Sequence, residues 1–211
     1  MHLLSRYNLF IFDWDNTLVS ASFLLNLTRY LKSRYWRKPS SIKIKNKLPT
    51  SRELSSMRLS DLEIESRIFS AAYSAYLAIQ KPKLKPKAVD VLSQLKSSGK
   101  KVAIFSDGRS YRILKEIHIF DLGRYIDFAL GANTIAKYKP DPTGLLYIMQ
   151  RFKEDKKKSL YIGDMAIDIV TARMAGIDSC AISDGLSSVR ALKREQPNYL
   201  FANLEAFLRA L

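Results

Sequence analysis

The sequence predicts an α/β protein with a Rossmann-like parallel sheet as its core and an α-helical cap inserted after the first strand. Short apolar runs alternate with helical patterns through the second half of the chain, which favours parallel strands joined by helices. Residues 13–101 separate the first apolar run from the second, and helical patterns fill much of this interval. Acidic residues directly follow two of the runs, at positions where open α/β sheets bind ligands.

The composition is that of a globular protein with one dominant core. The chain has 211 residues, of which 47% are hydrophobic and 11% aromatic, which excludes disorder and collagen-like repeats. Its single cysteine, Cys180, excludes an internal disulfide or a multi-cysteine metal site. No stretch approaches the ~20 apolar residues of a membrane span, and no secretory signal is recognisable. A cytoplasmic protein that does not act at a membrane is expected.

Each apolar run is short and continuous, as in strands covered on both faces. We expect strands at 9–12, 102–105, 128–130, 160–162 and 180–182. Helical patterns between and after these runs predict helices at 88–96, 111–117, 143–152, 166–175 and 204–211. Gly99 and Gly176 follow two of them and are suitable C-terminal caps.

The interval after the first strand reads as a helical insertion. Apolar residues recur at helical spacing in two stretches, Leu24, Leu27 and Leu31 and then Ile68, Ala72, Tyr76 and Ile79. The insertion ends in the proline-punctuated segment 81–86. The predicted domains are therefore a core formed by 1–17 and 84–211, and a helical cap formed by 18–83. The cap leaves the sheet at the edge where ligands bind, so it is placed to cover a site.

Four acidic residues indicate a metal site. Asp13 and Asp15 follow the first predicted strand, and Asp164 and Asp168 follow the fourth. Because the carboxyl ends of parallel strands share one edge, these carboxylates should converge, and without compensation they would repel one another by several kcal/mol. Oxygen-only ligands favour Mg²⁺ over zinc or copper, and Mg²⁺ accepts phosphate oxygens in its remaining positions.

Four motifs in order resemble those of the haloacid dehalogenase-like hydrolases, and specifically of their phosphoglycolate phosphatase-like phosphatases. They are Asp-Trp-Asp-Asn-Thr-Leu at 13–18, Ser106 at the end of the second strand, Lys-Pro-Asp-Pro at 139–142, and Gly-Asp-Met-Ala-Ile-Asp-Ile at 163–169. The insertion matches the family's cap, which lies between the first and second motifs. The strand context and the order make chance agreement improbable.

The resemblance implies a role for each matching residue. Asp13 corresponds to the nucleophile that forms an aspartyl phosphate, and Asp15 to the acid/base residue that protonates the leaving oxygen and later activates water. Ser106, Asp107 and Lys139 correspond to the phosphate-binding positions, with Lys139 also neutralising charge in the transition state. Lys137 is the alternative lysine that could reach the phosphate in place of Lys139.

The same resemblance implies the metal ligands. Mg²⁺ would be held by Asp164 and Asp13, by the backbone carbonyl of Asp15, and by Asp168 directly or through a water. The second acid, Asp15, distinguishes the phosphatases from the dehalogenases of the family.

Three positions depart from the family pattern. Asn16 stands where glycine is usual, and asparagine tolerates the unusual backbone angles of such a turn. Asp107 stands where asparagine is common and places a negative charge near the phosphate. This charge is unfavourable for phosphate binding unless Arg109 pairs with it. Met165 replaces a serine or threonine, a change expected to affect helix capping more than chemistry. The string Ser-Asp-Gly at 183–185 repeats that at 106–108 but falls out of order.

The charge is strongly positive and unevenly distributed. The chain has 35 basic and 20 acidic residues, and 29–47 holds eight basic residues with no acidic one. A basic cap could recruit an anionic small phosphorylated substrate, could bind nucleic acid, or could be a solvated surface, which we favour. The resulting hypothesis is an Mg²⁺-dependent phosphatase for a small phosphorylated metabolite. The alternatives are a phosphomutase that uses the same intermediate and a basic nucleic-acid-binding protein without turnover.

Overall fold

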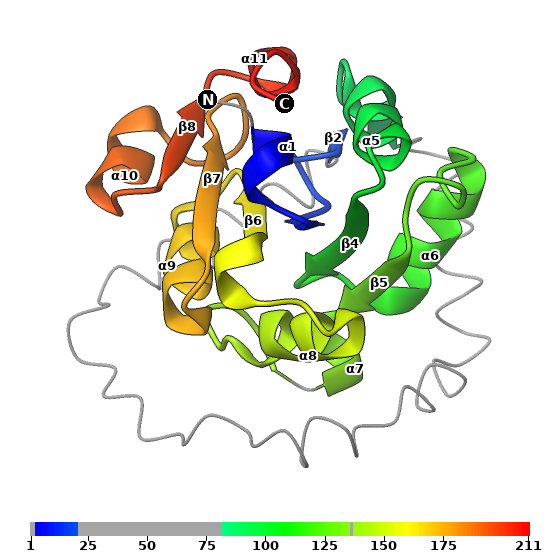
Figure 1. The fold of residues 1–211 in the computed structure, drawn as a ribbon, viewed down its shortest axis with the longest axis horizontal. Helices are drawn as coiled ribbons and strands as arrows, with labels where there is room; N and C mark the ends of the chain where they lie inside the picture. The colour runs from blue at the N-terminus through cyan, green and yellow to red at the C-terminus, as the bar shows by residue number, and fades with distance from the viewer. Residues whose placement is uncertain (1–2, 21–81, 136) are drawn as a thin grey trace.

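The computed structural model describes residues 3–20, 82–135 and 137–211. These residues form a parallel sheet between two layers of helices (Figure 1). The predicted cap, 18–83, falls almost entirely outside the described residues, and so does the basic stretch 29–47. In the part of the chain that is described, no helix has the length and apolar character needed to span a membrane.

The sheet has six strands in the order β5-β4-β1-β6-β7-β8, and every neighbouring pair is parallel. β1 lies near the centre, between β4 and β6, so the strand order reverses around it; such a switch point is where ligands bind. The strands are β1 (Leu9–Phe12), β4 (Lys101–Ser106), β5 (Phe128–Gly131), β6 (Ser159–Gly163), β7 (Asp178–Ile182) and β8 (Tyr199–Phe201).

Alternate residues of the strands build two large cores, because successive side chains point to opposite faces, and a third, small cluster includes Ala181 of β7. Phe10 and Phe12 of β1 join one core, which includes residues of α1, α5, α6 and α11. Leu9 and Ile11 join the other, which includes residues of α8 and α9. The helices are α1 (Leu3–Arg6), α5 (Ala88–Ser97), α6 (Ser110–Ile119), α7 (Ala132–Ile135), α8 (Thr143–Phe152), α9 (Ala166–Ala175), α10 (Val189–Arg194) and α11 (Leu204–Leu208), with a short 3-10 turn at Lys156–Lys158.

The described residues on either side of segment 21–81 lie side by side. β2 (Val19–Ser20) pairs antiparallel with β3 (Lys83–Leu84) in a separate two-stranded ribbon. Just beyond β3, the Lys85 ammonium lies 2.9 Å from the Asp184 carboxylate, in the loop after β7. The chain therefore leaves and re-enters the core at one place, close to the loop that contains 183–185.

The predicted Rossmann-like fold is confirmed, with differences at the ends of elements. All five predicted strands are present, and helices 143–152 and 166–175 have the predicted bounds. The sequence patterns missed α1, α7, α10, β2, β3 and β8, which have six residues or fewer, and the last helix ends at Leu208 rather than 211. Such elements are too short to show a full hydrophobic period.

Candidate active site

Three neighbouring strands deliver polar residues to one edge of the sheet. Asp13 follows β1 directly, and its backbone N–H continues the ladder to β6 by donating to the Ile162 carbonyl at 2.7 Å. Ser106 is the last residue of β4, and Asp164 follows the last residue of β6. Because β4, β1 and β6 are adjacent and parallel, these three residues emerge side by side.

Three carboxylates meet at this edge. Asp13, Asp164 and Asp168 each offer one oxygen, and these oxygens lie within 4.8 Å of one another. All three residues are buried, with at most 2% of their surface exposed. Charges of one sign at this separation repel strongly away from water, so the cluster requires positive charge nearby.

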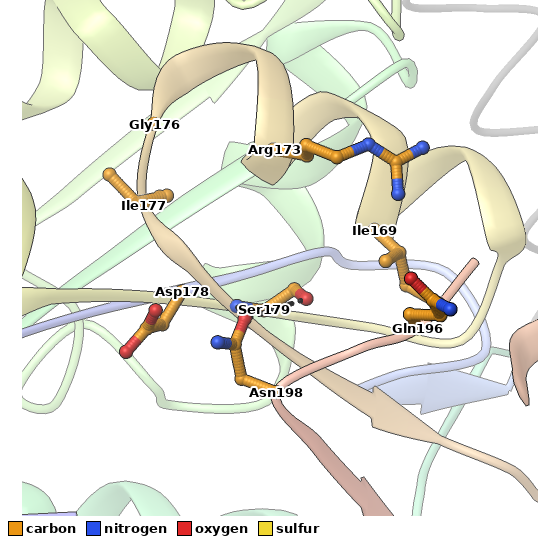
Figure 2. A pocket seen from close by; sticks show the side chains of 8 residues that line it. All are labelled: Ile169, Arg173, Gly176, Ile177, Asp178, Ser179, Gln196 and Asn198. Atoms are coloured by element: carbon orange, nitrogen blue, oxygen red, sulfur yellow. Dashed lines mark hydrogen bonds between the residues drawn. The ribbon is translucent and has the colours of Figure 1, made fainter.

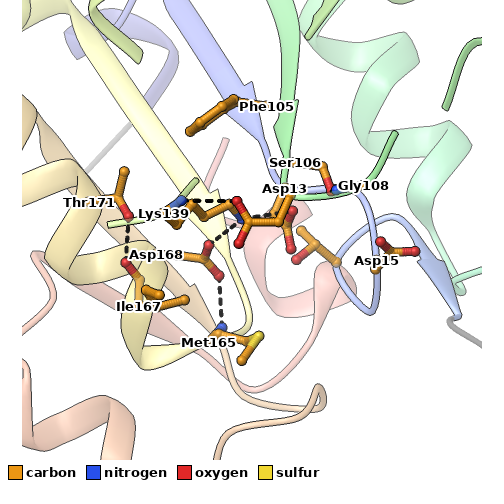
Figure 3. A network of polar contacts seen from close by, with 12 residues as sticks. Asp13, Asp15, Phe105, Ser106, Gly108, Lys139, Met165, Ile167, Asp168 and Thr171 are labelled. Atoms are coloured by element: carbon orange, nitrogen blue, oxygen red, sulfur yellow. Dashed lines mark hydrogen bonds and ion pairs between the residues drawn. The ribbon is translucent and has the colours of Figure 1, made fainter. Parts of the chain in front are cut away.

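Lys139 supplies part of that charge. Its ammonium lies 2.9 Å from Asp13 Oδ1 and 2.7 Å from Asp168 Oδ1 (Figure 3). Burial alone would lower the pKa of the Lys139 ammonium, but the charges of Asp13 and Asp168 outweigh burial and raise that pKa well above its ordinary value. Lys139 is therefore a permanent cation between a residue after β1 and one on α9. The rival Lys137 lies 3.8 Å from Asp141 instead, outside the cluster.

Asp168 is fixed by its position in the first turn of α9. Its Oδ2 accepts the backbone N–H of Met165 at 2.9 Å, which caps the helix. Its Oδ1 accepts the Tyr161 hydroxyl at 3.3 Å in addition to Lys139. Burial raises the pKa of Tyr161 well above its ordinary value, so this residue stays a hydroxyl donor. Methionine at 165 thus keeps the capping interaction, since the backbone carries it.

Asp164 is held by the loop after β7. Its Oδ2 accepts the backbone N–H of Leu186 at 2.7 Å, and its Oδ1 accepts the Thr17 hydroxyl at 3.4 Å. Gly185 packs so closely that a Cβ there would lie 2.3 Å from the Asp164 Cβ. The Ser-Asp-Gly string at 183–185 does not follow the order of the motifs. It belongs instead to the loop that orients Asp164.

Asp15 lies to one side of the Lys139 contacts (Figure 3). It is 2% exposed, and both of its carboxylate oxygens accept hydrogen bonds from the Arg112 guanidinium of α6. Its carboxylate is therefore engaged by Arg112 and does not belong to the Asp13–Asp164–Asp168 group. Asn16, the next residue, has φ 60°, so asparagine adopts the left-handed turn that was predicted for it.

Ser106 and Asp107 lie at the end of β4. Ser106 is buried, and its Oγ accepts the Gly108 backbone N–H at 3.1 Å. The Asp107 carboxylate accepts the backbone N–H of Lys139 at 3.0 Å. The Asp107 carboxylate thus holds the backbone of the segment that carries Lys139.

The donor set fits a hard divalent cation. It consists of carboxylates, without a cysteine or histidine ligand, and this chemistry favours Mg²⁺ or a similar ion. The cluster also holds more negative charge than Lys139 compensates, so a cation would relieve the remaining repulsion. Asp13, Asp164 and Asp168 are the residues whose side chains could bind it.

Sequence reasoning missed the residues that support the site. Arg112 and Glu116 stand four apart on α6, a spacing that usually marks a solvated ion pair, yet Glu116 is only 1% exposed. Tyr161 lies within a strand and reads as core. The position of Thr17 within the first motif could have indicated its role at the site. For 183–185 the sequence offers no indication besides its likeness to 106–108.

A separate pocket of about 330 Å³ lies at the opposite edge of the sheet (Figure 2). Asp178 and Ser179, at the beginning of β7, line it together with Arg173 of α9. Its polar groups are already engaged: Arg173 pairs with Glu195 at 3.0 Å, and the Ser179 backbone N–H donates to Asn198 at 2.9 Å. The acidic cluster and this pocket are therefore different places.

Comparison with known proteins gives a consistent family. The family model described as haloacid dehalogenase-like hydrolase matches residues 10–182. Phosphoglycolate phosphatase 1 of Pseudomonas aeruginosa is 26% identical over 214 residues, which cover 95% of this chain and 78% of that protein. A pyrophosphatase-named protein of Caldanaerobacter subterraneus is 29% identical over 129 residues, so the match spans only 59% of that protein.

Solved structures share the fold. A HAD-superfamily hydrolase of Ehrlichia chaffeensis has a TM-score of 0.61 and 21% identity, with 99% of this chain and 96% of that chain covered. A haloacid dehalogenase-like family hydrolase of Streptococcus pneumoniae has a TM-score of 0.64 and 19% identity, with coverages of 97% and 99%. At these identities the likeness concerns the fold.

Proposed function

The chain belongs to the haloacid dehalogenase-like hydrolases, and we propose that it is an Mg²⁺-dependent phosphatase that acts on a small phosphorylated metabolite. One observation carries this proposal. Asp13 lies buried at the carboxyl edge of the sheet, in contact with Lys139 and grouped with Asp164 and Asp168. That arrangement provides a nucleophilic oxygen, a fixed cation and a set of metal ligands within one small region.

In the first half of the reaction, a carboxylate oxygen of Asp13 attacks phosphorus. A bond forms between that oxygen and phosphorus, and the bond from phosphorus to the ester oxygen breaks. Asp15, which takes up a proton from solvent when substrate binds, gives this proton to the leaving oxygen, so the product departs as an alcohol. Lys139 and Ser106 hold the phosphoryl oxygens, and the ammonium offsets the negative charge that gathers on them.

In the second half, water replaces the enzyme oxygen on phosphorus. Asp15, now ionised, takes a proton from the water as the water oxygen bonds to phosphorus. The bond between phosphorus and Asp13 breaks, which releases inorganic phosphate and restores both carboxyl groups to their starting states. One residue can serve both halves because giving up its proton in the first half leaves it ionised, and therefore able to accept a proton, in the second.

The carboxylates of Asp13, Asp164 and Asp168 would hold the metal, together with the Asp15 backbone carbonyl. When bound, Mg²⁺ supplies charge neutralisation that lets the anionic nucleophile and the anionic phosphate approach. Leu186 and Thr17 orient Asp164, and Met165 orients Asp168, so the chain presents these ligands in fixed positions.

The names of the relatives support a small substrate. Several are phosphoglycolate phosphatases, so short phosphorylated acids are the first candidates. The predicted cap, 18–83, would contact the part of the substrate that differs between such compounds and so set the specificity. The basic residues of 29–47 would add attraction for an anion.

A screen of phosphorylated metabolites with Mg²⁺ or with EDTA tests the proposal. We expect the wild type to release phosphate from at least one short phosphorylated acid in Mg²⁺ but not in EDTA. The Asp13→Asn variant, which keeps the size of the side chain, should release none. The Lys137→Met variant is a control for altered charge near the site and should stay active. Phosphate release by Asp13→Asn at the wild-type rate would refute the role of Asp13.

The products separate the alternatives. A phosphomutase would return the phosphoryl group to the substrate and yield an isomeric phosphate ester instead of inorganic phosphate. A nucleic-acid-binding protein without turnover would show no Mg²⁺-dependent hydrolysis and would bind DNA or RNA in a strongly salt-dependent way.

A further inference from the structure

Arg112 holds Asp15 by both carboxylate oxygens. Its Nη1 donates to Oδ1 at 2.8 Å and its Nη2 donates to Oδ2 at 2.5 Å. The Asp15 side chain is 3% exposed and the Arg112 side chain 12%. A two-pronged contact of this kind fixes both the direction and the plane of a carboxylate, which a single hydrogen bond does not.

The Arg112 guanidinium also contacts a second carboxylate. Glu116 lies one turn further along α6, and each of its carboxylate oxygens accepts from Arg112 Nη1 at 3.3 Å. Glu116 also accepts the indole N–H of Trp14 at 2.5 Å. Trp14 stands between Asp13 and Asp15 in the chain, so the network starts and ends on the segment that carries both expected reacting carboxylates.

The loop after β4 leaves room for this network. A Cβ at Gly108 would lie 2.5 Å from Arg112 Nη2, so a larger residue would displace the guanidinium. The string at 106–108 thus contributes Ser106 to the phosphate edge and, through Gly108, space for Arg112.

We propose that Arg112 is a positioning residue that sets the orientation of the Asp15 carboxylate for proton transfer to the leaving oxygen. This inference rests on the proposed function, in which Asp15 is the proton donor. Proton transfer requires a heavy-atom approach of about 2.6–3.2 Å. Glu116 contacts the guanidinium and Trp14 holds Glu116, so both residues support the position of Arg112.

The leaving group distinguishes positioning from a merely structural role. A strongly basic leaving oxygen needs a proton in the transition state, whereas p-nitrophenolate departs readily without one. A variant that misplaces the donor therefore loses rate with basic leaving groups and keeps much of its rate with p-nitrophenyl phosphate. A variant with a distorted site loses rate equally with both.

The experiment compares kcat and KM for p-nitrophenyl phosphate and phenyl phosphate in saturating Mg²⁺. For Arg112→Met we expect kcat to fall at least tenfold with phenyl phosphate and less than about threefold with p-nitrophenyl phosphate, since general acid catalysis is typically worth ~10²–10⁴-fold. KM should change little. Asp15→Asn should show the same selectivity to a greater degree, and Arg112→Lys should recover part of the rate.

Two further variants keep the test decisive. Arg124→Met removes an exposed arginine that pairs with Asp121 and should behave as wild type. If Arg112→Met does not fold, as judged by circular dichroism, Trp14→Phe replaces it: this variant removes the indole N–H that Glu116 accepts and should show the same selectivity more weakly. Equal losses with both esters, or no loss, would overturn the role of Arg112. A wild-type enzyme that hydrolyses neither ester and no metabolite of the screen would instead contradict the proposed function.

Discussion

Lys139 is the residue on which the acidic cluster depends most. Its ammonium contacts Asp13 and Asp168 at 2.9 and 2.7 Å, and it is only 2% exposed. Removing one partner of a buried ion pair leaves the other charges uncompensated, at a cost of typically about 3–5 kcal/mol. Lys139 therefore contributes to the stability of the metal-free protein as well as to phosphate binding.

We expect Lys139→Met to lower the free energy of unfolding by about 3–5 kcal/mol in EDTA. Saturating Mg²⁺ should restore much of this loss, because the cation takes over the compensation of the carboxylates. Thermal unfolding with EDTA and with Mg²⁺ measures both effects. Lys137→Met, which removes a half-exposed neighbour, is the control. An equal Mg²⁺-induced shift in Lys139→Met and wild type would contradict this interpretation.

At the residue scale, the sequence predicted what stands at strand ends and missed what supports it. Asp13, Ser106 and Asp164 could be placed because each follows a recognisable apolar run. Arg112 and Glu116 could not, because an arginine and a glutamate four apart on a helix look the same whether they face solvent or a buried carboxylate.

At the scale of elements, the loop after β7 contacts both the acidic cluster and the segment that follows β3, where the chain returns to the core. Leu186 donates its backbone N–H to Asp164, while Asp184 pairs with Lys85, which follows β3. The Ser187 hydroxyl also accepts the backbone N–H of Ala166 at the beginning of α9. One loop thus contacts an expected metal ligand, the helix that carries another, and the end of the inserted segment.

Gly185→Ala should weaken Mg²⁺ binding while leaving the fold intact. The added Cβ would lie 2.3 Å from the Asp164 Cβ and 2.4 Å from its Oδ2, so Asp164 must move from its position. Changes that disturb ligand orientation typically reduce metal affinity by about 10–100-fold. Isothermal titration calorimetry with Mg²⁺ checks this.

Gly123→Ala is the matched control for this substitution. A Cβ at Gly123 meets no atom within 4 Å, so that variant should bind Mg²⁺ as wild type does. Unchanged affinity in Gly185→Ala would show that the loop does not set the position of Asp164.

The helices and strands that could be predicted are those with a full pattern. α8 and α9 show one apolar face over ten residues each, and β1 is buried throughout. β8 is a run of only three apolar residues, all partly buried, shortly after Pro197, and the sequence patterns missed it although the predicted strand at 128–130 is equally short. The helices of the predicted cap stay a prediction, since they lie outside the described residues.

At the scale of the whole molecule, two apolar cores on opposite faces of the sheet hold the binding edge in place. Cys180, the only cysteine of the chain, lies in the first of them with 1% of its surface exposed. Burial raises the pKa of the Cys180 thiol well above its ordinary value. The folded protein therefore keeps this thiol protonated under conditions in which the unfolded chain ionises it.

This difference predicts how stability depends on pH. Because the folded state retains a proton that the unfolded state loses, the contribution of Cys180 is present below the unfolded thiol pKa and decreases above it. Between pH 7.5 and 9.5, wild type should lose about 1 kcal/mol more stability than Cys180→Ala does. Urea unfolding of both proteins at each pH measures this. An identical pH dependence would mean that the thiol ionises in the folded state.

The central claim concerns a covalent bond to Asp13, and acid quenching of a single turnover tests it most directly. With a ³²P-labelled substrate found in the metabolite screen, we expect radioactive phosphate on the wild-type chain within the first turnover in Mg²⁺. The label should be released by hydroxylamine, as an acyl phosphate is, and should map to the peptide that contains Asp13. Hydrolysis of the substrate without any label on the protein, or a label on another residue, would contradict the account.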